Sequence, residues 1–350
     1  MLPRNLPLVL YMEGALTGPS GKMGFGVLRY SPNPIVAVID STQAGRDASE
    51  FGPWRSCPIV STLEEAKALG AKAMVLGIAP SGGLIPPIWY PDLDRAVANG
   101  LGLVNGLHDF LAPRYPQLPQ EPTTDGPFIW DIRHEPSGLA PGTGAAADLP
   151  CRRLLMVGTD MAVGKMTAGL EIYRTAKESG IKTAFVATGQ IGITVTGAGV
   201  PLDAVRVDFA AGAIERETIR AAEEVGPEGL VIIEGQGSLA HPGSTANLAL
   251  LRGACPTHLI LCMRAGQKTI RSLEHIKIPP LGDLCRLYEA LAAGAGAFPR
   301  PVTVAVAVNT ADLDDAEAER AIRAVEEELG LPAIDPVREG CERLVAAAMG

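Results

Sequence analysis

Residues able to bind phosphate stand near the middle of the chain, where Gly158 and Gly164 flank a loop of five residues and Lys165 follows. Apolar residues 154–157 predict a buried strand before the loop, and an apolar pattern of helical period predicts a helix after it. In this arrangement the loop N–H groups and the helix N-terminus face an anion, while the lysine adds a positive charge. An ordinary glycine-containing turn is the alternative interpretation. The residues predicted to bind phosphate groups are Gly158, Thr159, Asp160, Val163, Gly164, Lys165, Met166 and Thr167.

Two departures from the common phosphate loop bear on its chemistry. The loop has five residues between its glycines where the common pattern has four, and Met166 stands in place of the usual serine or threonine. The hydroxyl that ordinarily binds Mg²⁺ is therefore missing, and Thr167 lies about 100° further round the helix. We expect phosphate binding without magnesium-dependent phosphoryl transfer and without a required metal.

Further polar residues follow other predicted strands of the same sheet. Because ligands of a parallel sheet lie beyond the carboxyl ends of its strands, we expect these residues to converge on the phosphate loop. Glu234 is predicted to act as a general base or an amine-binding carboxylate, and His241 in the same glycine-rich loop as a proton carrier. A solvated acid and a hydrogen-bonded loop histidine are their alternatives. Gln190 and Arg264 suit recognition of a substrate carboxylate.

The composition excludes several classes of protein. A net charge of -9 argues against a nucleic-acid surface, so an anionic ligand must meet local groups such as Lys165. No run of 18 or more apolar residues predicts a membrane span, and the first 14 residues make a poor signal peptide. The six cysteines are scattered without a CxxC spacing, which indicates a reduced, cytoplasmic protein without a zinc site.

The order of strands and helices that the sequence indicates around these residues predicts two α/β domains. At roughly 150 residues per domain, a chain of 350 residues has room for two. Strands alternate with helices over residues 1–112, which predicts a smaller Rossmann-like domain. Residues 113–150 are rich in proline and are predicted to be a linker, with one strand at 128–133 added to a sheet edge. Residues 151–350 are predicted to form the second parallel sheet, around the phosphate loop.

Two features of the first domain have separate interpretations. Residues 14–23 imitate a second phosphate loop, but we expect residues 24–28 to form no helix, so the segment is predicted to be a mobile loop. Asp40 closes a predicted strand, where it is either a ribose ligand or a solvated acid.

The motifs together resemble a known family. GTDMAVGKMT, ATGQIGI, VDFAAGAIE and IIEGQGSLAHP, with the Rossmann-like first domain and the proline-rich joint, are similar to the DUF1611 family, which is associated with D-glutamate N-acetyltransferase. The loop itself resembles that of dethiobiotin synthetase, a P-loop NTPase-like fold. Asn309 resembles the strand-end asparagine that binds an adenine edge in dethiobiotin synthetase relatives.

This resemblance implies an acyltransferase that uses acetyl-CoA as co-substrate and D-glutamate as acceptor, in D-amino acid catabolism. It fits the missing hydroxyl after Lys165, because a loop that only grips the phosphates of CoA needs no metal. Two alternatives remain: an ATP- and magnesium-dependent ligase or carboxylase of the dethiobiotin synthetase type, and a non-catalytic nucleotide-binding protein. For partners, we expect a small-molecule amino acid substrate and a homo-oligomer, with no nucleic acid and no membrane.

Overall fold

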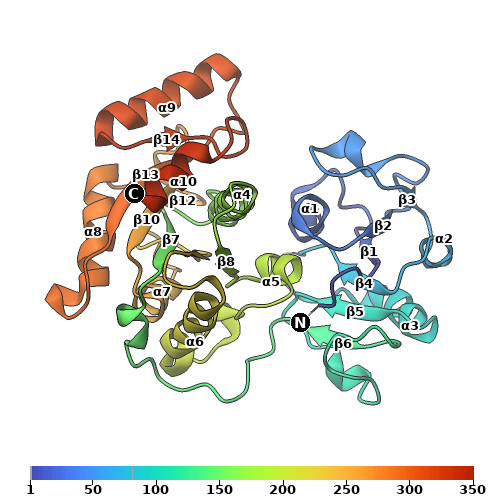
Figure 1. Ribbon diagram of the computed structural model, residues 1–350. Helices are drawn as coiled ribbons and strands as arrows, with labels where there is room; N and C mark the ends of the chain where they lie inside the picture. Colours follow the sequence, from blue (N-terminus) through green and yellow to red (C-terminus); the bar gives the residue numbers. More distant parts are fainter. Residues whose placement is uncertain (1, 81) are drawn as a thin grey trace. The chain divides into compact units, whose positions relative to one another are not determined.

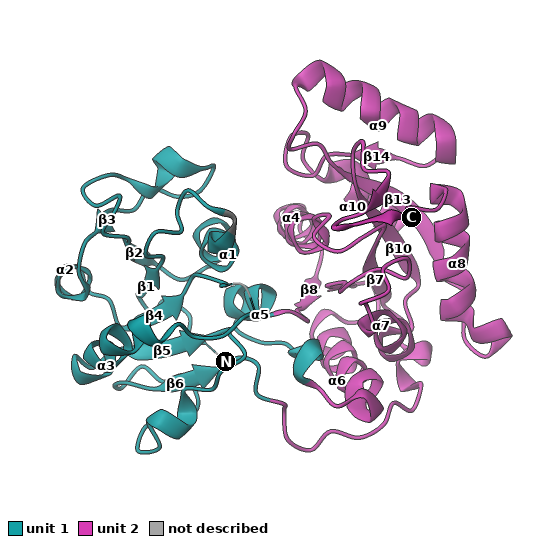
Figure 2. Ribbon diagram, turned by 180° about the vertical axis from the view of Figure 1, so that it is seen from behind, with its two compact units in different colours: residues 1–134, 190–204 teal, residues 135–189, 205–350 magenta. Residues whose placement is uncertain are grey.

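The computed structural model describes residues 2–80 and 82–350, which divide into two units (Figure 2). Unit 1 comprises residues 1–134 and 190–204, and unit 2 comprises residues 135–189 and 205–350. Each unit is an α/β fold built on its own parallel sheet, as the sequence predicted. Within the described ranges, no helix combines the length and the apolar composition needed to cross a bilayer.

Unit 1 is built on a six-stranded sheet in the order β3-β2-β1-β4-β5-β6, with every neighbouring pair parallel. This is the strand order of a Rossmann-like fold, in which the order reverses between β1 and β4. The strands are β1 (Leu8–Tyr11), β2 (Ile35–Ile39), β3 (Ile59–Val60), β4 (Ala73–Leu76), β5 (Gly102–Asn105) and β6 (Ile129–Asp131). The helices are α1 (Lys22–Tyr30), α2 (Leu63–Ala68), α3 (Tyr90–Ala98) and α5 (Gln190–Thr196).

The sequence-based prediction of no helix after residue 23 was wrong, because α1 runs through residues 24–28. Glycine lowers intrinsic helix propensity, but here it allows close packing. A Cβ on Gly24 would lie 2.3 Å from Met12 Sδ, and the Gly24 N–H donates to the Gly77 carbonyl at 2.9 Å. Packing of the helix against the sheet therefore outweighs the low propensity of its glycines.

The unit boundaries also differ from the expected domains. The strand expected at residues 128–133 is β6, which pairs with β5 along Leu103↔Ile129 and extends the sheet of unit 1. Residues 113–134 thus belong to unit 1 and not to a separate linker, and α5 joins that unit from a distant part of the sequence.

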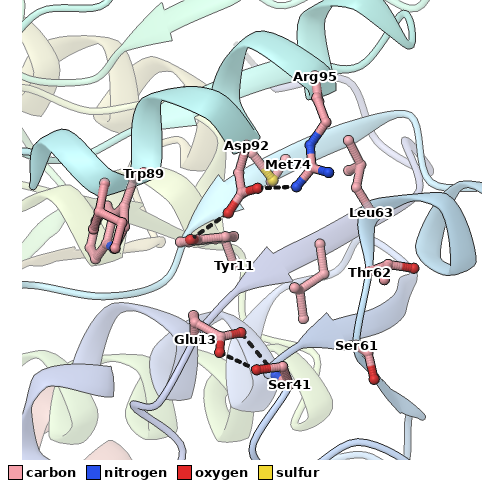
Figure 3. Close-up of a pocket in the computed structure, with 12 residues that line it drawn as sticks. Tyr11, Glu13, Ser41, Ser61, Thr62, Leu63, Met74, Trp89, Asp92 and Arg95 are labelled. Carbon is pink, nitrogen blue, oxygen red and sulfur yellow. Dashed lines mark hydrogen bonds and ion pairs between the residues drawn. The ribbon is translucent and has the colours of Figure 1, made fainter.

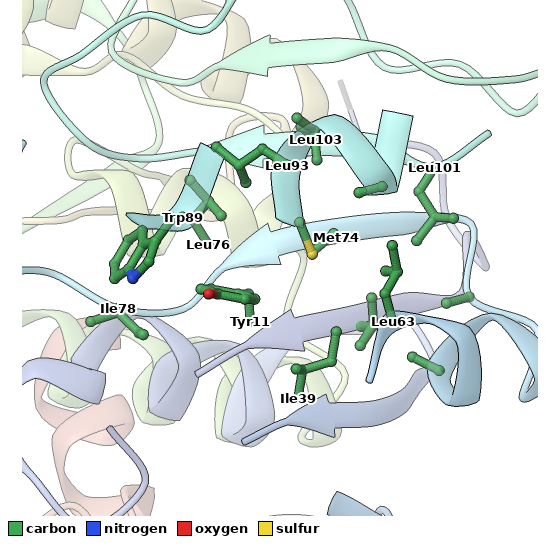
Figure 4. Close-up of a cluster of buried hydrophobic side chains, with 14 of the residues drawn as sticks. Tyr11, Ile39, Leu63, Met74, Leu76, Ile78, Trp89, Leu93, Leu101 and Leu103 are labelled. Atoms are coloured by element: carbon green, nitrogen blue, oxygen red, sulfur yellow. The ribbon is translucent and has the colours of Figure 1, made fainter. Parts of the chain in front are cut away.

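The core of unit 1 lies between its sheet and helices α2 and α3 (Figure 4). Tyr11 and Leu76 from the strands pack there with Trp89 and Leu93, and the Tyr11 and Trp89 rings meet edge to face with centroids 5.4 Å apart. This packing fixes the ends of β1 and β4 with respect to α3.

Unit 2 is built on a second six-stranded parallel sheet in the order β14-β13-β10-β7-β9-β8 (Figure 1). Its strands are β7 (Arg152–Gly158), β8 (Thr183–Val186), β9 (Leu230–Ile233), β10 (His258–Arg264), β13 (Val302–Asn309) and β14 (Ala333–Ile334), and β11 (Thr269–Ile270) with β12 (Leu273–Lys277) forms a separate antiparallel hairpin. The helices are α4 (Lys165–Glu178), α6 (Val207–Val225), α7 (Ala246–Ala254), α8 (Leu281–Ala293), α9 (Asp315–Leu329) and α10 (Glu342–Met349). Because β7 lies between β10 and β9, the loop after β7 stands between the exits of those two strands.

Candidate functional site

The predicted phosphate loop connects β7 to α4 and curls tightly at its second glycine. Gly164 has φ +108° and Ala162 has φ +56°, so both adopt left-handed backbone conformations. Lys165 opens α4 and is buried, and its Nζ donates to the Asp160 carbonyl at 2.8 Å. The Thr159 hydroxyl is buried too and has no hydrogen-bond partner among the described residues. A buried ammonium and an unpartnered hydroxyl in one loop suit an anionic ligand.

Gly235 at the exit of β9 allows the lysine to lie against that strand. A Cβ at this position would lie 1.6 Å from the Met156 carbonyl oxygen and 3.1 Å from Lys165 Cδ, so a larger residue does not fit. Burial lowers the pKa of Lys165 to about 8, and the nearby Cys262, Asp160 and Glu234 oppose that shift. The lysine and the exit of β9 therefore form one packed corner.

Glu234 is a second titratable group in that corner. Its side chain is buried, and its Oε2 accepts hydrogen bonds from the backbone N–H groups of Thr188 at 2.8 Å and Gly189 at 3.1 Å. Burial raises its pKa to about 7, while the two N–H donors and Lys165 act in the opposite direction. A carboxyl group held by one oxygen, with a pKa near neutrality, is able to exchange a proton with a ligand.

Asp160, predicted to help bind the ligand, uses its carboxylate inside the protein. Its Oδ1 accepts from the Met161 N–H at 2.6 Å. Its Oδ2 accepts from Gln267 Nε2 at 2.6 Å and from the Arg271 N–H at 2.7 Å. The side chain is fully buried, so it ties the phosphate loop to the segment that carries β11.

Other predicted loop residues lie where the pattern implies, and β13 adds a side chain beside them. Val163 is buried against the start of the loop, while Met166 and Thr167 lie in the first turn of α4. Asn309 ends β13, and its Nδ2 lies 3.7 Å from the position that a Cβ on Gly164 would take. Its Oδ1 accepts from the Ala311 N–H at 3.1 Å, and its amide N–H₂ has no hydrogen-bond partner among the described residues.

The two residues predicted to bind a substrate carboxylate lie in different surroundings. Arg264 lies beside Asn309 in the register of β10 and β13, and its Nε donates to Asp312 at 2.8 Å in a partly exposed ion pair. Gln190 begins α5 and belongs to unit 1, where a Cβ on Gly106 would lie 3.2 Å from its Cγ. Arg264 alone is thus brought to the strand exits of unit 2.

His241 is a hydrogen-bonded loop residue, half-buried after β9. Its Nδ1 accepts from the Gly243 N–H at 3.0 Å, which leaves Nε2 to carry the proton of the neutral ring. No hydrogen bond between His241 and Glu234 is found in the described part of the chain. There, too, no three His, Cys, Asp or Glu side chains are grouped as metal ligands.

Tyr288 of α8 is a residue that sequence reasoning missed. Its hydroxyl donates to the Gly158 carbonyl at 3.0 Å and accepts from the Leu239 N–H at 3.0 Å. It thus fixes the start of the phosphate loop to the loop that follows Glu234. The sequence carries no signal for this role, because a tyrosine at helical spacing is typical of an ordinary core position.

Unit 1 contains a separate cavity of about 330 Å³ beside the ends of β1 and β2 (Figure 3). Glu13 accepts from the Ser41 N–H at 2.8 Å on one side, and Tyr11 donates to Asp92 at 2.9 Å on the other. Asp40, predicted as a ribose ligand or a solvated acid, is fully buried, and its Oδ1 accepts from the Thr42 N–H at 3.1 Å. Asp40 is therefore not a solvated acid; it organises the turn that follows β2.

Comparisons with known proteins cover both units. Residues 140–345 match the family model "Domain of unknown function (DUF1611_C) P-loop domain", and residues 41–135 match "Domain of unknown function (DUF1611_N) Rossmann-like domain". A curated D-glutamate N-acetyltransferase from Tritonibacter scottomollicae is 37% identical over 342 residues, which cover 97% of this chain and 98% of that protein. One from a Pseudoalteromonas species is 36% identical over 283 residues, covering 81% and 82%. The crystal structure of a DUF1611 family protein from Anabaena variabilis ATCC 29413 superposes with a TM-score of 0.91 at 46% identity, over 99% of both chains.

Proposed function

The chain belongs to the DUF1611 family, and on that premise we propose that it transfers the acetyl group of acetyl-CoA to the amine of D-glutamate. The products are N-acetyl-D-glutamate and CoA. Two curated relatives carry the name of this activity, and both are aligned over most of their length. The structural observation that carries the proposal is Glu234, a buried carboxyl group with a pKa of about 7 beside a loop suited to phosphate.

The phosphate loop supports the choice of acetyl-CoA as donor. The pyrophosphate would be bound by the Lys165 ammonium, the Thr159 hydroxyl and the N–H groups at the start of α4. Asn309 would form hydrogen bonds with the adenine edge. Met166 supplies no hydroxyl for Mg²⁺, which fits a loop that binds phosphate without transferring it. The loop then only binds the phosphate groups, and the reaction takes place at the thioester.

The transfer requires a proton acceptor, because an amino acid at neutral pH carries an ammonium group. In the proposed step Glu234 Oε1 takes a proton from that ammonium, and the freed nitrogen attacks the thioester carbonyl. The C–N bond forms and the C–S bond breaks, the nitrogen gives up its second proton as the amide forms, and the departing CoA thiolate takes up that proton. The backbone N–H groups of residues 235–237 would donate to the oxyanion, and His241 Nε2 would relay protons to solvent.

The length of CoA sets a condition on this role. The pantetheine arm has about the length of four to five extended residues, roughly 15 Å, so a thioester at full extension lies far from the pyrophosphate. Glu234 lies close enough to Lys165 for the two charges to interact, and the adjacent Gly235 packs against the Lys165 side chain, so Glu234 lies at the phosphate end of the site. It can act as the base only when the arm folds back over the loop. With an extended arm, Glu234→Gln would change CoA affinity and leave kcat intact.

Recognition of the acceptor needs cations as well as a base, because glutamate has two carboxylates. Arg264 is the candidate in unit 2, and its ion pair with Asp312 is partly exposed, so a substrate carboxylate can share or replace Asp312. Gln190 is the second candidate, as the residue next to Gly189 in the chain. The proposal predicts that Arg264 affects the acceptor more than the donor.

The experiment is an incubation of the protein with acetyl-CoA and single D- and L-amino acids, followed by mass spectrometry of the products. We expect N-acetylation of D-glutamate above all other amino acids, with unchanged rates when EDTA is added. Acetylation of a different amine would refute the choice of acceptor. ADP formation from ATP and Mg²⁺, without acetyl transfer, would replace the proposal by the ligase alternative.

A further inference from the structure

We propose that the hairpin β11–β12 binds the 3′-phosphate of CoA through Lys268 and Arg271, so that the site distinguishes CoA from its 3′-dephospho form. The inference rests on the proposed function, since it assumes that the phosphate loop holds CoA. It assigns a role to residues 267–277, which the resemblance and the catalytic proposal leave unused.

The hairpin is attached directly to the phosphate loop. The Asp160 carboxylate of that loop is fully buried and receives hydrogen bonds from Gln267 Nε2 and the Arg271 N–H, at 2.6 and 2.7 Å. These two donors belong to residues on either side of β11. A buried carboxylate beside an anion site is unfavourable unless donors compensate its charge, and here two of its three donors come from the hairpin, the third being the Met161 N–H of the loop itself. The backbone of Arg271 is thereby held next to the loop.

The hairpin segment is basic in a chain of net charge -9. Between residues 267 and 277 it carries Lys268, Arg271 and Lys277 against the single acid Glu274. Lys268 and Arg271 are exposed. Within the described ranges, neither side chain forms an ion pair. Among the described residues many arginines pair with carboxylates, as Arg264 does with Asp312. Cations without such a partner, on a hairpin attached to a phosphate loop, suit a second anionic group on the ligand.

The topology places the hairpin on the side where a nucleoside would lie. The sheet order runs from β7 to β10 and then to β13, so the segment after β10 and the end of β13 lie on the same side of the phosphate loop. Asn309, at the end of β13, lies beside Gly164 and is the candidate for the adenine edge. The ribose joins the adenine to the pyrophosphate, so a 3′-phosphate on that ribose falls between Asn309 and the loop edge held by Asp160.

The test compares binding of CoA and 3′-dephospho-CoA by calorimetry, for the wild-type chain and the double variant Lys268→Ala/Arg271→Ala. We expect the wild type to bind CoA at least about tenfold more tightly, since hydrogen bonds to charged groups are worth that much each, and we expect added salt to reduce the preference. The double variant should lose the preference while keeping its affinity for 3′-dephospho-CoA. Arg323→Ala is the control, because Arg323 is an exposed arginine of α9 that pairs with Glu319 of the same helix.

Three results would overturn the inference. Equal wild-type affinities for the two ligands would mean that no residue binds the 3′-phosphate. Equal weakening of both ligands by the double variant would mean that the hairpin only supports the loop. Absence of binding of either ligand to the wild type would remove the inference together with the proposed function, whereas the first two results leave acetyl transfer intact.

Discussion

Tyr288→Phe should destabilise unit 2 although it changes one atom far in sequence from the phosphate loop. The variant keeps the buried ring and removes the hydroxyl that bonds the Gly158 carbonyl and the Leu239 N–H, each at 3.0 Å. The carbonyl is buried and the N–H half-buried, so neither is fully compensated by water. Loss of a partner by such groups costs about 1–3 kcal/mol, and we take about 2–3 kcal/mol for the two bonds together.

Thermal unfolding by calorimetry measures this cost. About 1 kcal/mol shifts the midpoint of a domain of 150–250 residues by roughly 2–4 °C, so the unit 2 transition should fall by about 4–12 °C. Tyr173→Phe is the matched control, because the Tyr173 hydroxyl lies at the surface and only accepts from Lys177 at 3.3 Å. Its midpoint should stay within about 2 °C of the wild type. Equal midpoints for the two variants would refute the role assigned to Tyr288.

The remaining predictions concern the proposed acetyl transfer. Glu234→Gln should lower kcat by roughly 10²–10⁴ with acetyl-CoA binding retained, and His241→Ala should also lower kcat; an effect on acetyl-CoA affinity alone would count against a base at Glu234. Because a base must be deprotonated and the pKa of Glu234 is about 7, kcat/KM should rise with pH up to about 7 and then level off, and a flat profile between pH 5 and 8 would contradict this. Lys165→Ala should weaken acetyl-CoA binding, measured by calorimetry, and the factor by which Kd rises should exceed the factor by which kcat falls. Arg264→Ala should raise KM for D-glutamate far more than for acetyl-CoA, and equal effects on both would rule out its role.

The strand pattern of the sequence was sufficient for the fold class and for the position of the phosphate loop. Apolar runs of strand length before Gly158 and Asn309 predict buried parallel strands, because both faces of such a sheet are covered. Residue 235 must be glycine, because a Cβ there would clash with the Met156 carbonyl oxygen. The sequence also predicts Glu234 at the exit of the strand before it. Parallel topology then brings Lys165, Glu234 and Asn309 together without further information. The catalytic roles of Glu234 and His241 stay predictions.

The features that the sequence missed depend on tertiary contacts. Helix α1 forms because Gly24 packs against Met12, a contact that helix propensity does not describe. The proline-rich segment contributes β6, because an edge position tolerates prolines nearby that a central strand would not. Asp160 and Tyr288 each have a partner more than 100 residues away in the chain, so no local pattern identifies these contacts.

The most direct test of the central claim follows the acetyl group itself. The wild-type chain and Glu234→Gln are incubated with D-glutamate and acetyl-CoA carrying two ¹³C atoms in the acetyl group, with EDTA present, and the products are weighed by mass spectrometry while free CoA thiol is titrated. The account predicts N-acetyl-D-glutamate two mass units heavier than the unlabelled compound, one CoA thiol per product, and a large loss of both with Glu234→Gln. Wild-type protein that binds acetyl-CoA but releases neither labelled product nor thiol would contradict it.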